Sequence, residues 1–370
     1  MKYNTSLGEN TDNALARLDE LCSLGTLDFL AGLWDLDSGG FYSSYKMRKK
    51  RSETADFDST AQVISFLSSG AIKGTRGKLP SLIADDIREK LAQFCATDPV
   101  RGKEIMKKLE VAEPTPSEKK KTNKKKESPP PTPEHLASEE GLVRYLDELW
   151  EADGSDAVGT VRDSLGKIKS AGLSDTLFAY LDGLCTRGEY PFNFSDERSS
   201  STQASKLLSL YSDEGRSIPN IMGLAVRISD AISEDVRAVS ISHIYGLWAS
   251  LGATVKNASV GSDEENLEQI RLCAYIRERA VELLENTEKL LSRHKRSDGG
   301  FSYFWDIPSD SDVNSTVTAV HGVRGNLFLS LGLTTPPLFE AEALEEMFDK
   351  MRIKGKTRRR SFLDMFKKDN

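Results

Sequence analysis

Cysteine and histidine are scarce in this chain of 370 residues, which contains four of each. Cys22, Cys95, Cys185 and Cys273 lie far apart among apolar neighbours, and no two of them form a C-x-x-C pair. This spacing predicts reduced cysteines in the core rather than disulfides or zinc ligands. The few histidines do not supply a tetrahedral ligand set either. The sequence therefore predicts no bound metal and no cofactor.

Several motifs of well-known enzyme classes are missing as well. The chain has no Walker A loop, no G-x-G-x-x-G after a strand, no H-E-x-x-H and no G-x-S-x-G. These absences argue against P-loop, dinucleotide-dependent, zincin and α/β-hydrolase chemistry. No stretch of about 18 apolar residues occurs, and no basic segment followed by an apolar one opens the chain. A cytoplasmic location is the expectation.

The overall charge is mildly acidic, at -7 with a sequence pI of about 5.4. Duplex-binding proteins usually present a net basic face, so this balance argues against specific nucleic-acid binding. The partner expected instead is a small molecule or another protein, and its identity stays open.

Residues 112–134 differ sharply from their surroundings, because lysines and prolines replace every large apolar side chain there. Such a segment cannot bury enough surface to offset its ordering entropy, which predicts a disordered linker. It would separate a first helical part, 1–111, from a second helical part, 135–353. The two parts are expected to pack together into one fold. A basic amphipathic tail, 354–370, would follow and could dock on a membrane surface or a protein groove.

The apolar pattern outside the linker is helical, and almost nothing alternates as a strand does. Ser262 and Glu265 form a capping-box signature at the start of one long stretch. Helices are predicted near residues 12–35, 58–70, 82–94, 138–150, 156–186, 200–212, 218–232, 234–251, 262–284, 313–331 and 338–352. The fold class predicted is all-α.

Three segments share one repeated unit: a glycine turn, an aromatic residue, and then a Ser-Thr step that opens a helix. The first copy has Gly39-Gly40-Phe41 followed by Ser59-Thr60, and the third has Gly299-Gly300-Phe301 followed by Ser315-Thr316. The second, at residues 188–204, is more worn. Recurrence at three places is stronger evidence than any one match. The glycines allow a reversal at positive φ, and the aromatic ring fills the gap between two helices.

This repeated unit resembles the repeats of terpenoid cyclases and protein prenyltransferases. The resemblance implies an α/α toroid, in which Gly-Gly-Phe turns precede the inner helices, and it covers about a third of the chain. The sequence leaves open whether the array closes into a ring or is incomplete. Residues 56–61 also resemble the acidic motif of class II terpene cyclases, although Ser59 replaces the last aspartate of that motif.

The resemblance implies that Asp58 would be a general acid, kept protonated by burial and by its neighbour Asp56. The simpler interpretation makes Asp58 the N-cap of the helix that begins near Ser59, since polar residues recur at this place in all three copies. Asp310 and Asp312 in the third copy allow the same two interpretations.

The polar and aromatic loops of the unit are the candidate ligand-binding surface. The residues proposed to bind a ligand are Phe41, Tyr42, Tyr45, Tyr303, Trp305 and His321. Loops of this kind lie on one rim of stacked helix pairs, where function is usually carried. Binding without catalysis is the favoured function. A terpenoid or prenyl enzyme led by Asp58, or a carbohydrate-active enzyme that uses rim carboxylates, is the alternative.

Overall fold

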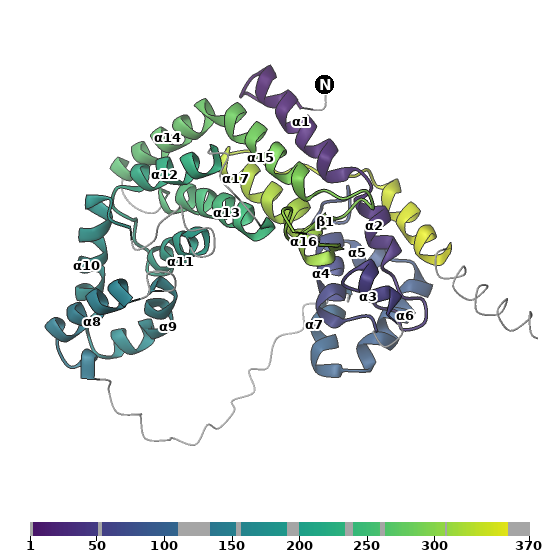
Figure 1. Ribbon diagram of the computed structural model, residues 1–370, viewed down its shortest axis with the longest axis horizontal. Coiled ribbons are helices and arrows are strands. Elements are labelled where there is room, and N and C mark those ends of the chain that lie inside the picture. Colours follow the sequence, from purple (N-terminus) through teal and green to yellow (C-terminus); the bar gives the residue numbers. More distant parts are fainter. Residues whose placement is uncertain are drawn as a thin grey trace, which may run out of the picture. The chain divides into compact units, whose positions relative to one another are not determined.

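The computed structural model describes residues 3–50, 54–109, 134–152, 157–190, 200–233, 240–259, 263–307 and 309–353 (Figure 1). Regular structure in these ranges is almost entirely helical, which confirms the all-α prediction. Within them, the only strands are β1 (Phe301–Ser302) and β2 (Ser311–Asp312), which pair antiparallel. None of the described helices combines the length and the apolar composition needed to cross a bilayer.

The chain forms two compact units. Unit 1 contains Met1–Val111, Ile232–Trp248 and Arg277–Asn370, and unit 2 contains Ala112–Ala231 and Ala249–Ile276. Except for Glu134, which opens a short 3₁₀ turn, the predicted linker lies outside the described residues, as does the whole predicted tail 354–370.

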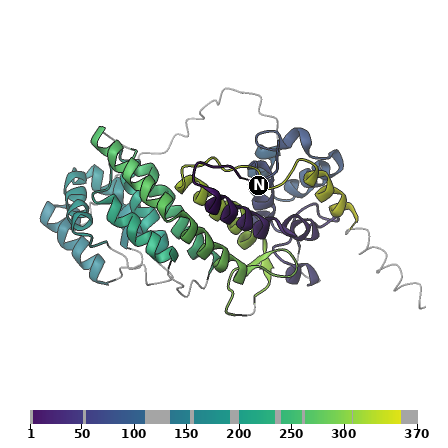
Figure 2. The ribbon, with the colours of Figure 1, turned by 90° about the horizontal axis from the view of Figure 1, so that it is seen from above.

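Unit 1 brings the first and third copies of the repeated unit together, although they are far apart in the sequence. Helix α1 packs against α15, and α4 packs against both α16 and α7, while α6 pairs with α7. Figures 1 and 2 both show α1 lying along α15. The helices of this unit are α1 (Glu9–Ser23), α2 (Thr26–Gly32), α3 (Tyr45–Lys49), α4 (Phe57–Ser68), α5 (Leu79–Leu82), α6 (Asp85–Ala96), α7 (Pro99–Leu109), α15 (Ala280–His294), α16 (Val313–Val317) and α17 (Arg324–Ser330). Residues 342–353 are helical as well.

In unit 2, α8 packs against α10, and α9 packs against both α10 and α11. Asn257, a buried side chain, accepts a hydrogen bond from the Ile218 amide at 2.8 Å and donates one to the Arg216 carbonyl at 2.9 Å. The helices that lie wholly or partly in this unit are α8 (Glu139–Ala152), α9 (Ala157–Ser170), α10 (Ser174–Arg187), α11 (Ser200–Asp213), α12 (Ile221–Ser233), α13 (Ile241–Asn257) and α14 (Asp263–Glu278).

Two of the predicted helices are divided at glycines. The helix expected over 12–35 ends at Ser23, because Gly25 adopts a φ of 70° before α2 begins. The helix expected over 156–186 is α9 followed by α10, and Gly172 between them has a φ of 76°. Positive φ is readily accessible to glycine only, so these residues end a helix that the apolar pattern alone would continue.

Candidate functional site

The first and third copies of the repeated unit share the same hydrogen bonds. The amide of Phe41 donates to the Thr60 hydroxyl at 2.9 Å, and the amide of Phe301 donates to the Thr316 hydroxyl at 2.9 Å. Asp56 accepts from the Ser59 amide at 2.7 Å, as Asp312 does from the Ser315 amide. The threonine of the Ser-Thr step therefore holds the aromatic residue, and the aspartate before it caps the helix.

The glycine turns pack closely on the backbone of segments distant in the sequence. Gly39 has a φ of 81° and Gly299 a φ of 91°. A Cβ added at Gly39 would lie 2.2 Å from the carbonyl oxygen of Lys90, and one at Gly299 would lie 2.2 Å from that of Gly25. Both positions require glycine for two reasons: the positive φ angle, and the lack of room for a Cβ atom beside the neighbouring carbonyl oxygen.

Phe41 and Tyr42, predicted to contact a ligand, are core residues. Phe41 is 1 % exposed and Tyr42 is 3 % exposed. The ring of Phe41 meets that of Trp34 edge to face, with centroids 5.1 Å apart. In the third copy Lys295 takes the place of the tryptophan, with its ammonium group 4.3 Å from the Phe301 ring centroid. The aromatic after the glycines is a packing residue in both copies.

The carboxylates have different surroundings. Asp56, not Asp58, caps α4, so the expectation of an Asp58 cap was off by two residues. The Asp58 side chain is 80 % exposed and pairs with Arg101 at 3.1 Å. Burial raises the pKa of Asp312, and its hydrogen bonds from Ser315 oppose that rise. Asp310 is exposed on the β1–β2 connection.

The connection between β1 and β2 carries two of the predicted aromatics, Tyr303 and Trp305. Tyr303 and Phe304 contact each other edge to face at 4.6 Å, and the Arg293 guanidinium lies 5.1 Å from the Trp305 ring. Tyr303 and Trp305 are half-buried, and Ile307 beyond them is 51 % exposed. Figure 2 shows this connection projecting past the helices of unit 1. We refer to residues 303–307 as the 303–307 loop.

Tyr45, in the corresponding loop of the first copy, lies on the neighbouring helix α2. Its ring meets Phe29 edge to face at 5.6 Å, and burial raises the pKa of its hydroxyl. The stems of the two loops are joined, because the Val313 amide donates to the Ser43 carbonyl at 2.9 Å. Tyr45 and the 303–307 loop therefore belong to one side-by-side pair of connections.

His321 lies in a π-helical turn, η2 (Thr318–Val323), that joins α16 to α17. Its side chain is exposed, and crowding by surrounding protein atoms together with the nearby Arg324 lowers its pKa. On the adjacent helix α13, Tyr245 is 39 % exposed and contacts Gly322. The sequence analysis did not select Tyr245, and a tyrosine in an apolar helical stretch carries no signal that would have marked it.

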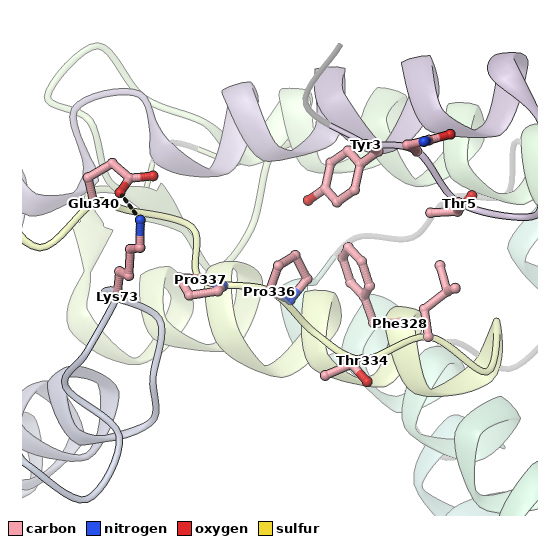
Figure 3. Close-up of a pocket in the computed structure, with 10 residues that line it drawn as sticks. Tyr3, Thr5, Lys73, Phe328, Thr334, Pro336, Pro337 and Glu340 are labelled. Carbon is pink, nitrogen blue, oxygen red and sulfur yellow. Dashed lines mark hydrogen bonds and ion pairs between the residues drawn. The ribbon is translucent and has the colours of Figure 1, made fainter.

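A pocket of about 490 Å³ in unit 1 also escaped the sequence analysis (Figure 3). Tyr3 and Phe328 face each other across it, and Lys73 pairs with Glu340 at one end at 3.0 Å. Beneath it Arg324, 3 % exposed, donates to Asp19 at 2.6 Å and to the Pro336 carbonyl at 2.8 Å. No sequence motif announces this network, because its members come from segments far apart in the chain.

The second copy of the repeated unit is only partly described. Gly188 ends α10 with a φ of 69°, and the Tyr190 hydroxyl donates to the Asn220 carbonyl at 3.1 Å. Residues 191–199 lie outside the described ranges, so its loop stays a prediction, and α11 begins at Ser200, next to the predicted Ser-Thr step. Across the described ranges, no three His, Cys, Asp or Glu side chains gather as metal ligands would.

Comparison with known protein families, with curated proteins and with solved structures finds no match to this chain. The functional assignment therefore depends on the geometry of the residues themselves.

Proposed function

We propose that this protein is an α/α toroid that binds a small molecule or a protein partner without catalysing a reaction. The toroid is supported by the two copies that repeat the same turn, cap and threonine bonds. It is also supported by the pairing of α1 with α15 and of α4 with α16, which places the first and last copies side by side as a ring requires.

The 303–307 loop is the proposed contact surface. The observation that carries this choice is that hydrogen bonds fix the backbone of a loop with three half-buried aromatic residues and the exposed Ile307. The Ile241 amide donates to the Tyr303 carbonyl at 3.1 Å, and the Phe304 carbonyl accepts from Arg296 at 3.0 Å and from Ser302 at 2.7 Å. Aromatic and aliphatic side chains on a preorganised backbone lose little entropy on binding, which favours recognition.

The surroundings of Asp58 do not favour the cyclase alternative. Asp58 is exposed and paired with Arg101, whereas a carboxyl that donates a proton near neutral pH needs burial. A role of residues 354–370 in docking stays a prediction, because they lie outside the described ranges.

A ligand screen on the full chain tests the proposed contact surface. A small-molecule fragment library is screened by ligand-observed NMR, and hits are measured by calorimetry against the double variant Trp305→Ala, Ile307→Ser. Leu24→Ser, which changes a 68 % exposed residue elsewhere in unit 1, is the matched control. We expect the double variant to lose binding and the control to keep it. Binding that survives in the double variant contradicts the assignment, and conversion of a bound compound over time contradicts the absence of catalysis.

Solution scattering tests the ring. A compact chain of this length has a radius of gyration of about 21 Å. The closed toroid predicts a radius of gyration near this value, and a radius well above it favours an open array.

A further inference from the structure

Tyr245 presents an aromatic ring on the surface of unit 1. A Cβ added at Gly322 would lie 2.9 and 3.0 Å from two carbons of this ring, so only glycine lets the ring lie against the π-helical turn. Tyr245 is 39 % exposed. One face thus rests on the turn, and the exposed part is available to a ligand.

The π-helical turn places His321 next to this ring. Such turns are rare and often occur at functional sites, because they displace one side chain from the regular helical position. His321 directly precedes Gly322 and is exposed. Crowding and Arg324 lower its pKa, which favours the neutral imidazole, a form that offers one donor and one acceptor.

Further uncharged hydrogen-bonding groups continue along the same helix. Thr318, half-buried, is one turn before His321, and Asn314 is one turn earlier again. The side-chain amide nitrogen of Gln62, on α4, donates to the side-chain oxygen of Asn314 at 3.2 Å. We call Gln62, Tyr245, Asn314, Thr318 and His321 the Tyr245 strip.

The Tyr245 strip carries no formal charge. The charged side chains near the strip in sequence already have partners. Asp312 accepts from the Ser315 amide and hydroxyl, and Asp58 pairs with Arg101. Arg324 is buried and bonded to Asp19 and the Pro336 carbonyl. A phosphate-bearing ligand needs cations, and a strongly cationic one needs carboxylates. The strip therefore suits a neutral ligand with one apolar face and many hydrogen-bonding groups.

We propose that the Tyr245 strip binds a neutral saccharide. The C–H face of a sugar ring packs against an aromatic face, whose π-electrons attract the slightly positive hydrogens. Amide, hydroxyl and neutral imidazole groups pair with sugar hydroxyls as both donors and acceptors. This inference rests on the proposed function only in that the protein binds a ligand. It names the class of ligand bound near His321, and its side chains are separate from the 303–307 loop.

Binding of defined oligosaccharides to the full chain tests the inference. Maltotriose, cellotriose, xylotriose and chitotriose are each measured by saturation-transfer NMR and calorimetry. We expect at least one to bind, and we expect Tyr245→Ala to raise its Kd at least about tenfold. Tyr245→Phe keeps the ring and should retain the affinity within about threefold, since the ring face provides the contact.

Gly322→Ala provides a second variant that keeps every ligand-contacting side chain. Its new methyl group would push the Tyr245 ring from its position, so the Kd should rise although the tyrosine is present. Far-ultraviolet circular dichroism and the melting temperature establish that each variant is folded.

Trp305→Ala separates this inference from the proposed function. We expect it to leave saccharide affinity unchanged. If none of the four sugars binds at 10 mM, or if Tyr245→Ala binds as well as the unmodified chain, the saccharide site is refuted while the 303–307 loop keeps its own test. Loss of sugar binding in Trp305→Ala alone moves the ligand to that loop and also overturns the inference.

Discussion

The first and third copies of the repeated unit share the same hydrogen bonds from backbone amides to threonine and aspartate side chains. They differ in the side chains that pack around the turn. Trp34 packs on Phe41 in the first copy, and Lys295 lies on Phe301 in the third. Lys295 is partly buried, and this burial lowers its pKa to about 8. The comparison teaches that the unit specifies a turn and a helix cap, while the neighbouring elements decide which side chains fill the space around it.

Two further positions differ in the same way. Leu33 of the first copy is matched by His294 of the third, since each directly precedes the residue that bridges to the aromatic. Twelve residues beyond the capping aspartates, α4 has the half-buried Ser68 where α17 has the buried Arg324. The third copy is therefore tied to α1 by an ion pair that the first copy lacks.

Breaking that ion pair should give the largest effect. Asp19→Ala leaves the Arg324 guanidinium buried without its carboxylate, so the free energy of unfolding should fall by about 4 kcal/mol. Ser68 is the residue of the first copy that corresponds to Arg324. Ser68→Ala removes only a hydroxyl bonded within its own helix. It should change stability by less than about 0.5 kcal/mol. Urea unfolding measures both, and equal losses would contradict the difference between the copies.

Alanine at the glycine turns should destabilise both copies alike. Gly39→Ala and Gly299→Ala each meet a backbone oxygen and an unfavourable φ, which together cost about 3 kcal/mol. Gly74→Ala is the control, because Gly74 has a φ of 84° but no atom within 4 Å of its added Cβ. Its cost should be about 1 kcal/mol. Melting temperatures in the same order, with Gly74→Ala least affected, support the shared turn; a control as damaging as the others refutes it.

The third copy alone should make stability depend on acid through His294. This histidine is fully buried, donates from Nδ1 to the Ser302 carbonyl at 2.9 Å, and has its pKa lowered to about 4 by burial. The unfolded chain takes up the proton near pH 6.5, so stability is full above that pH. It falls as the pH drops toward 4, by about 3 kcal/mol in total.

The substitution His294→Leu gives the third copy the residue type of the first. Urea unfolding between pH 4 and pH 7 should show that the stability of this variant relative to the unmodified protein increases as the pH falls. A constant difference across this range would mean that His294 does not couple folding to protonation.

The threonine bond should give the smallest effect and the same one in each copy. Thr60→Val and Thr316→Val leave the amide of the aromatic residue buried without an acceptor, at a cost of about 1–2 kcal/mol each. Thr97→Val changes an exposed threonine and should cost less than about 0.5 kcal/mol. Chemical unfolding compares the three, and a cost in one copy only would show that the bond is not a common element.

Much of the local structure follows from the sequence. The Ser-Thr steps, the glycine turns and the helical spacing of apolar residues predicted where α4, α6 and α16 lie. The starts were less accurate, because Asp56 rather than Asp58 caps α4 and α6 begins at Asp85, after the separate helix that contains Pro80. The helix boundaries at Gly25 and Gly172 were missed, since a continuous apolar pattern outweighed a single glycine in the prediction. The ligand-binding role of Phe41 and Tyr42 was expected from residue type, and residue type does not reveal burial.

The sequence by itself determined an all-α chain and the turn that it repeats, because both depend on residues close together in the chain. Only the tertiary structure decided that the first and last copies of this turn lie side by side, that Arg324 is buried on Asp19, and that Tyr245 lies on Gly322. These contacts join residues from distant segments, and their energy depends on burial and close approach that no local pattern of residues encodes.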